Sequence, residues 1–173
     1  MSSDVTIQIF GTVSMANPAA IDALAAEVAE EGTLDWTESI LDDEIVDLLV
    51  EAAEEGRALL LTRSDTNNLF AGVTSACQDL GLSYVVNVGE SGDDGYTSGF
   101  SWAPGMESEF HFSLTDDAPA LKVSEIRQLL GRGDNALQKR LDELESRTNV
   151  GKVVLAPGFV EAYEAQQAET PGI

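Results

Sequence analysis

The apolar positions in the first part of the chain change between two periods. Residues 5–9 alternate apolar and polar side chains, which predicts a strand with one buried face. Asn17 followed by Pro18 is a typical helix start, because asparagine caps a helix and proline fits its first turn. Apolar side chains then recur at helical spacing, and they do so again over residues 42–55. The pattern therefore predicts a strand followed by two amphipathic helices.

The middle of the chain continues this alternation of strands and helices. Residues 57–62 form an apolar run that is typical of a central strand. A third helical face runs from Leu69 to Leu80 and places Cys77 on its buried side, where a thiol is an inert apolar group. Three strand-like segments follow, joined by turn-rich connections: residues 83–88, 96–102 and 107–114. Such connections predict an antiparallel meander.

The last third of the chain has a different pattern. Residues 116–119 are expected to form a short linker. A first helix is predicted over residues 124–130, with Gly131 as its stop. A second helix is predicted over residues 135–147, behind Asp134 as its cap. Two short helices joined by a glycine-containing turn are thus expected here.

A short strand expected at residues 151–155 completes the outline of a winged helix-turn-helix. The segment IRQLLGRGDNAL at residues 126–137 resembles the winged helix-turn-helix of plasmid-encoded DNA-binding proteins of the KfrA type. The resemblance implies that the second helix enters the major groove of DNA. The base or phosphate contacts would then come from Asn135, Gln138, Lys139 and Arg140. A plain helical hairpin packed against the acidic part of the chain is the other interpretation of this pattern.

Charge divides the chain in the same place. The 173 residues include 31 acidic and nine basic side chains, a formal net charge of −22. Residues 1–121 hold 23 acids against Arg57 and Arg63, a balance of −21, whereas residues 122–173 hold eight acids against seven bases. A field of this kind favours a basic partner and opposes nucleic acids and anionic membranes. Adaptation to high salt, general solubility and a functional acidic face that imitates a phosphate backbone are three interpretations of it.

The helix expected over residues 42–55 is the candidate contact face. Its outer side carries a stripe of carboxylates, with two more expected in a glycine loop: Glu44, Asp47, Glu51, Glu54 and Glu55, then Asp93 and Asp94. One helical turn rises about 5.4 Å, whereas duplex DNA carries one charge per about 1.7 Å of its axis. One helix is therefore too sparse to imitate a duplex, and several acidic elements side by side would be needed. A solvated helix surface is the alternative interpretation of the stripe.

Signatures of catalysis and cofactor binding are missing. One cysteine and one histidine, Cys77 and His111, cannot build a zinc site of the Cys/His type. No phosphate-binding loop, dinucleotide fingerprint or nucleophile elbow occurs. We therefore expect no enzyme activity, no metal and no cofactor. The N-terminus lacks the pattern of a signal peptide, no apolar run is long enough for a membrane span, and the single cysteine suits the reducing cytoplasm.

These patterns together predict an α+β protein. Residues 1–117 are expected to form an acidic domain with a mixed or antiparallel sheet and helices on one face, and residues 118–173 a winged-helix-like helical unit. The leading functional hypothesis is a non-catalytic acidic binding protein. It would dock on the basic surface of a protein that handles nucleic acids and inhibit it as a DNA mimic, as anti-defence proteins of phages and plasmids do; this comparison rests on charge and size. The alternative is a DNA-binding regulator whose acidic domain forms a homodimer or recruits a partner.

Overall fold

The structure is a computed structural model that describes residues 4–36, 38–64, 68–89, 95–133 and 135–169. Within these residues, one sheet of nine strands is combined with six α-helices and one short 3₁₀ turn. The strands are β1 (Val5–Val13), β2 (Thr33–Leu34), β3 (Glu38–Ser39), β4 (Leu59–Arg63), β5 (Ser83–Val88), β6 (Ser98–Trp102), β7 (Phe110–Thr115), β8 (Ala118–Ala120) and β9 (Val153–Leu155). The helices are α1 (Pro18–Glu31), η1 (Asp42–Glu44), α2 (Ile45–Glu54), α3 (Ala71–Leu80), α4 (Val123–Gly131), α5 (Ala136–Thr148) and α6 (Phe159–Glu169). The α+β class is confirmed.

Strand β1 lies at the centre of the sheet. The strand order is β3-β2-β4-β1-β5-β6-β7-β8, with every pair in this order antiparallel. The ninth strand, β9, pairs with the C-terminal end of β1 in parallel. Gly11 has a φ of 114°, which favours glycine, and it lies where β1 leaves β4 and β5 and takes β9 as its neighbour. The expected meander is confirmed as β5, β6 and β7.

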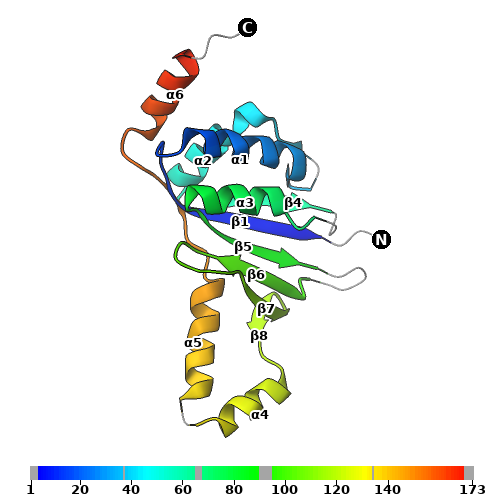
Figure 1. Cartoon of the computed structure of the whole chain (residues 1–173). Helices are drawn as coiled ribbons and strands as arrows, with labels where there is room; N and C mark the ends of the chain where they lie inside the picture. The colour runs from blue at the N-terminus through cyan, green and yellow to red at the C-terminus, as the bar shows by residue number, and fades with distance from the viewer. Residues whose placement is uncertain (1–3, 37, 65–67, 90–94, 134, 170–173) are drawn as a thin grey trace.

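The main core lies between the sheet and the helices α1, α2 and α3, which cover the same face (Figure 1). Val5, Ile7 and Ile9 are fully buried against these helices, so the expected alternation of β1 is confirmed. The cap predicted for α1 is also confirmed, because the side chain of Asn17 accepts a hydrogen bond of 3.2 Å from the backbone N–H of Ala20.

A second, smaller core lies on the opposite face of the sheet. It combines Val85 of β5 and two side chains of β7, Phe112 and Leu114, with Leu144 of α5. A Cβ atom at Gly99 would lie 2.5 Å from the ring of Phe112, so only glycine fits beneath this cluster. Helix α5 is thereby fastened to the face that α1, α2 and α3 leave uncovered. The helices of residues 1–117 share one face, as expected, and the helix on the other face belongs to the C-terminal part.

The linker predicted at residues 116–119 is wrong. Strands β7 and β8 form a hairpin whose two turn residues, Asp116 and Asp117, have φ angles of 51° and 60°. Aspartate tolerates this left-handed conformation in a tight hairpin turn. Pro119 lies in β8 at the edge of the sheet, where a missing N–H leaves no bond of the ladder unmade. The domain boundary expected at residue 117 falls inside this turn.

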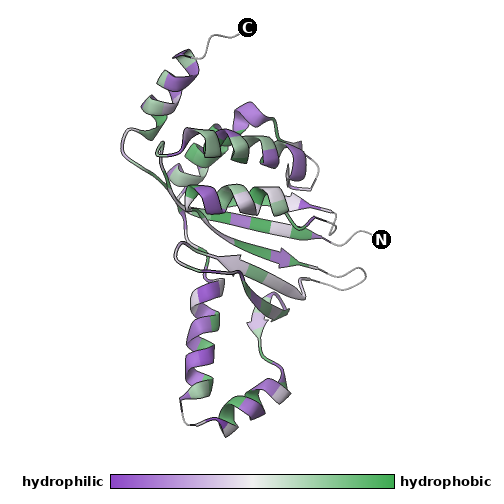
Figure 2. Ribbon diagram, in the orientation of Figure 1, coloured by the Kyte–Doolittle hydropathy of each residue, from purple (hydrophilic) through white to green (hydrophobic). Residues whose placement is uncertain are grey.

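Helices α4 and α5 form a hairpin that extends away from the sheet (Figure 1), and we call residues 122–152 the arm. Figure 2 shows hydrophilic residues along most of α5, in keeping with a helix that buries only Leu144. Gly131 belongs to α4 and the positive φ of 127° occurs at Gly133, while the predicted cap Asp134 lies outside the described residues. After the arm, β9 joins β1 of the central sheet, so a winged-helix arrangement is not confirmed.

The last helix packs beside the main core. Phe159 is buried there, and Val160 and Tyr163 are partly buried against the same cluster. Among the described residues, every helix falls short of the length and apolarity that a membrane crossing requires.

Candidate partner-binding site

The predicted acidic helix is present as η1 followed by α2. Ile45, Val46, Leu49 and Ala52 are buried, and Leu48 is only partly covered. This packing turns the whole predicted stripe to the outside, so that each of its carboxylates is exposed: Glu44, Asp47, Glu51, Glu54 and Glu55. The other two predicted contact residues, Asp93 and Asp94, lie outside the described residues.

One basic side chain divides the stripe into two parts. Arg57 forms an ion pair with Glu55 and another with Glu51, at 3.8 Å. Its guanidinium also donates a hydrogen bond of 3.2 Å to the carbonyl oxygen of Ala58. Exposed ion pairs contribute little to stability, but they reduce the charge that an approaching cation meets. The C-terminal part of α2 is therefore less negative than its sequence indicates.

The N-terminal part of the stripe gains carboxylates that sequence reasoning missed. Asp22 of α1, Asp42 and Asp43 of η1 and Asp47 of α2 all lie near the phenol of Tyr163, and we call these four residues the aspartate cluster. The first three line a hollow of about 320 Å³ whose remaining wall includes Tyr163 of α6. Burial raises the pKa of the Tyr163 phenol, and all four aspartates raise it further because negative neighbours disfavour the phenolate.

The aspartate cluster is open to an external cation. All four residues are exposed, and within the described part of the chain none of them forms an ion pair with a basic side chain. No group of three or more metal-ligating side chains among the described residues is placed to hold a metal ion. The sequence offered only a weak signal for the cluster, because Asp42 and Asp43 read as helix caps and Asp22 belongs to another helix.

Arg140, a predicted DNA contact, is held within the protein. Its guanidinium forms ion pairs with Glu125 of α4 at 3.3 Å and with Glu143 at 3.7 Å. It also lies over the aromatic ring of Phe110 in β7, 5.0 Å from the ring centre. Arg140 thus fastens α4, α5 and the sheet to one another, and these contacts do not favour its predicted role at a DNA surface.

The other predicted DNA contacts lie on the outside of the arm. Asn135, Gln138 and Lys139 are exposed, near the end of α5 that is farther from the sheet (Figure 1). The amide of Gln138 donates a hydrogen bond of 2.9 Å to the carboxylate of Asp142, one turn later. Asn135 does not cap α5 through its side chain. The structure therefore leaves these three side chains accessible but does not bring them together with Arg140.

No family model, curated protein or solved structure matches this chain. The resemblance of residues 126–137 to the KfrA type consequently has no support beyond that short pattern.

Proposed function

We propose that this protein is a non-catalytic acidic binding protein that docks on a basic surface of a nucleic-acid-handling protein and inhibits or modulates it as a DNA mimic. The observation that carries the proposal is the aspartate cluster, whose four exposed carboxylates have no ion-pair partner among the described residues. A surface that concentrates one sign of charge attracts the opposite sign and accelerates association.

The geometry of the cluster supports mimicry better than the stripe alone. Carboxylates along one helix recur only at about 5.4 Å, which is too sparse for a duplex. Asp22 comes from α1 and the other three aspartates from η1 and α2, so that charges from neighbouring elements converge on one surface. The C-terminal part of the chain contrasts with this surface, because residues 122–173 hold eight acids against seven bases. General acidity for salt tolerance or solubility predicts no such contrast.

Reversing the charge of the cluster tests the proposal. We expect the triple variant Asp42→Lys, Asp43→Lys and Asp47→Lys to weaken displacement of duplex DNA from a basic protein by roughly ten- to a hundredfold. The measurement is the fluorescence anisotropy of a labelled duplex of about 20 base pairs bound to core histones, titrated with the full chain at several salt concentrations.

A matched control separates the cluster from net charge. The variant Glu161→Lys, Glu164→Lys and Glu169→Lys changes the charge equally on α6, where all three residues are exposed. It should displace DNA nearly as well as the wild type. Equal weakening by both variants would assign the effect to net charge and remove the cluster from the proposal. Failure of the wild-type chain to displace DNA from any of several basic DNA-binding proteins would contradict the proposal itself.

A DNA-binding regulator is the second candidate, and the exposed bases of the arm favour it. These are Lys122, Arg127, Arg132, Lys139 and Lys152. Under this hypothesis, replacing Arg132 and Lys139 with alanine should abolish a mobility shift of labelled duplex DNA. The variant has two fewer cations to neutralise phosphates, so its binding releases fewer counterions from the DNA. Arg140 is left intact in this variant because its contacts are structural. The absence of any shift by the wild-type full chain at low salt would contradict the regulator hypothesis.

A further inference from the structure

Strand β4 has one side that is only partly paired. Along its inner side it pairs with β1 over its whole length, from Leu59 to Arg63. Along its outer side the neighbouring strand β2 reaches it at a single position, Thr33 opposite Thr62. The first half of β4 therefore forms an open sheet edge among the described residues. Unpaired edges of this kind are ready templates for another strand.

The peptide groups of Leu60 face this open side. The carbonyl oxygen of Thr62 points outward, because it accepts a hydrogen bond of 2.9 Å from the hydroxyl of Thr33. The carbonyl oxygen of Ala58 accepts its bond from the Arg57 side chain. Peptide groups of alternate residues point to the same side of a strand, so those of Leu60 point outward as well. Among the described residues, Leu60 has no hydrogen-bond partner on that side.

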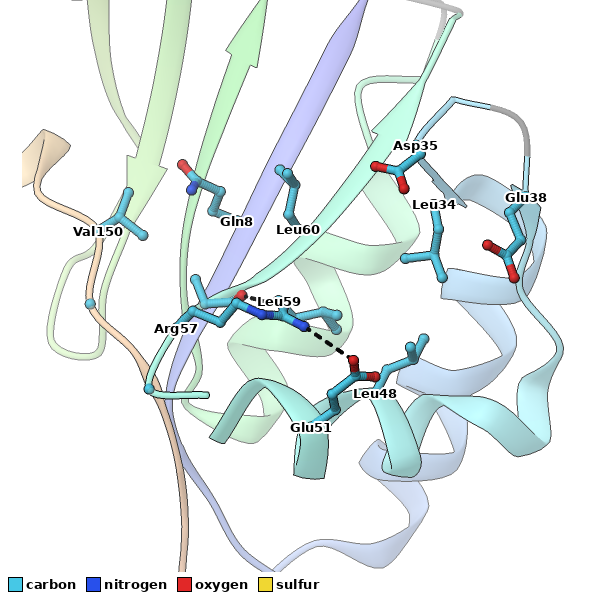
Figure 3. A pocket seen from close by; sticks show the side chains of 13 residues that line it. Gln8, Leu34, Asp35, Glu38, Leu48, Glu51, Arg57, Leu59, Leu60 and Val150 are labelled. Atoms are coloured by element: carbon cyan, nitrogen blue, oxygen red, sulfur yellow. Dashed lines mark hydrogen bonds and ion pairs between the residues drawn. The ribbon is translucent and has the colours of Figure 1, made fainter. Parts of the chain in front are cut away.

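A hollow of about 670 Å³ adjoins this edge. Figure 3 shows Leu34 of β2 and Leu48 of α2 pointing toward one another on one side of it, with Leu60 on the strand. The side chain of Leu60 is 43% exposed, a large fraction for an apolar residue in a sheet. Glu38 and Glu51 contribute carboxylates to the lining, and Glu38 forms no ion pair among the described residues.

Side chains close both ends of the open edge. At one end the guanidinium of Arg57 donates a hydrogen bond to the carbonyl oxygen of Ala58 and forms an ion pair with Glu51. At the other end the hydroxyl of Thr33 forms hydrogen bonds with the carbonyl oxygen and the hydroxyl of Thr62. The interval from Ala58 to Thr62 measures about 13 Å at about 3.3 Å per residue. Only a short extended segment fits between these ends.

We propose that this groove binds a short, extended, basic segment of the partner protein by strand addition to β4. The segment exchanges hydrogen bonds with the N–H and C=O of Leu60, places an apolar side chain against Leu34 and Leu48, and directs a lysine or arginine toward Glu38. This inference rests on the proposed function and states how the basic partner is recognised. Charge decides between possible occupants, because a second copy of the chain would bring its own net charge of −22 to an acidic groove.

Amide hydrogen exchange, followed by NMR on the full chain, tests the pairing directly. The probe is an acetylated tetrapeptide of alternating lysine and valine, about as long as the open interval. In the free protein, the amide of Leu60 should exchange at least about tenfold faster than those of Leu59 and Leu61, which face β1. Saturating peptide should slow it about tenfold or more. A Leu60 amide that is already protected in the free protein, or that the bound peptide leaves unchanged, would overturn the proposal.

Variants and a modified probe separate strand addition from attraction by charge. Leu60→Pro removes the outward N–H, and proline is tolerated where that group faces away from the ladder. Glu38→Lys is a separate variant that replaces an exposed side chain. Each of the two variants should weaken peptide binding about tenfold or more, as measured by fluorescence anisotropy. The same peptide N-methylated at alternate residues should bind equally weakly, since it cannot complete the pairing. Undiminished binding in Glu38→Lys or of the methylated peptide would overturn the proposal. If Leu60→Pro does not fold, the exchange measurement on the wild type decides.

The lysine variant of Asp42, Asp43 and Asp47 completes the design. It should retain the protection of Leu60 by the peptide, because these residues do not line the groove. Loss of DNA displacement with retained protection would assign the two effects to different surfaces. A wild-type chain that displaces DNA from histones but gives no protection of Leu60 would leave the proposed function intact and remove the groove from it.

Discussion

Replacing Phe70 with alanine should lower the free energy of unfolding by about 4 kcal/mol. Phe70 is fully buried in the main core and immediately precedes α3. Removing its ring deletes a large apolar surface and leaves a cavity between α3 and the sheet, because helices fixed by their other contacts cannot close around the space. Urea denaturation monitored by circular dichroism measures the change. A loss below about 1 kcal/mol would contradict the described packing.

The backbone conformation of Phe70 leads to a second prediction, on the relative stability of its glycine and alanine variants. Its φ is 60°, a left-handed conformation that costs an L-residue with a side chain about 1 kcal/mol and that glycine adopts freely. Phe70→Gly should therefore be about 1 kcal/mol more stable than Phe70→Ala, although it removes one more carbon atom. Phe100 in β6 is the matched control, since it is buried without a positive φ. At Phe100 the glycine variant should be the less stable of the two.

Replacing Glu31 with alanine should lower the free energy of unfolding by about 3 kcal/mol. Glu31 is buried at the end of α1, and its carboxylate receives hydrogen bonds from Asn68 at 3.2 Å and from the backbone N–H groups of Gly72 and Val73 at 2.9 and 3.4 Å. Both N–H groups belong to the first turn of α3, where a negative charge is favourable. The alanine variant leaves buried donors unpaired. Urea denaturation near pH 7 measures the loss.

Glu27, one turn earlier on α1, is the control for this prediction. Partial burial, followed by the charges of Glu31 and Glu30, raises the pKa of the Glu27 carboxyl above its ordinary value of 4.5. The folded chain therefore binds this proton more tightly than the unfolded chain, and the ionised carboxylate opposes folding above the raised pKa. Glu27→Gln should leave stability unchanged or increase it near pH 7, and any gain should vanish below the ordinary pKa. A loss as large as that of Glu31→Ala would contradict the assigned hydrogen bonds.

Local signals predicted the elements well, and tertiary contacts explain the failures. The alternation of residues 5–9 and the cap at Asn17 depend on neighbouring residues, which a sequence displays directly. Asp116 and Asp117 were misread because aspartates occur both in linkers and in tight hairpin turns, and only the pairing of β7 with β8 distinguishes the two. In α4, Val123 is 64% exposed, because a helical period in the sequence does not reveal whether anything covers the apolar side chains.

The candidate sites show the same limit more strongly. The exposed stripe on α2 followed from its period. The addition of Asp22 to Asp42 and Asp43 required the packing of α1 beside η1, which no spacing in the sequence encodes. Arg140 read as a surface cation because Phe110, thirty positions earlier, is distant along the chain. The open edge of β4 was equally invisible, since it depends on how briefly β2 pairs with it.

Because β1 pairs with β9, the strand that is synthesised first in this sheet is the last to gain all of its neighbours. β1 leaves the ribosome before all of its neighbours, which lie at residues 59–63, 83–88 and 153–155. Contacts so distant along a chain are entropically costly to close and slow to form. Ile7 and Ile9 therefore stay unpaired until residues 59–63 have been added. The C-terminal end of β1 stays incomplete until residues 153–155 have been added.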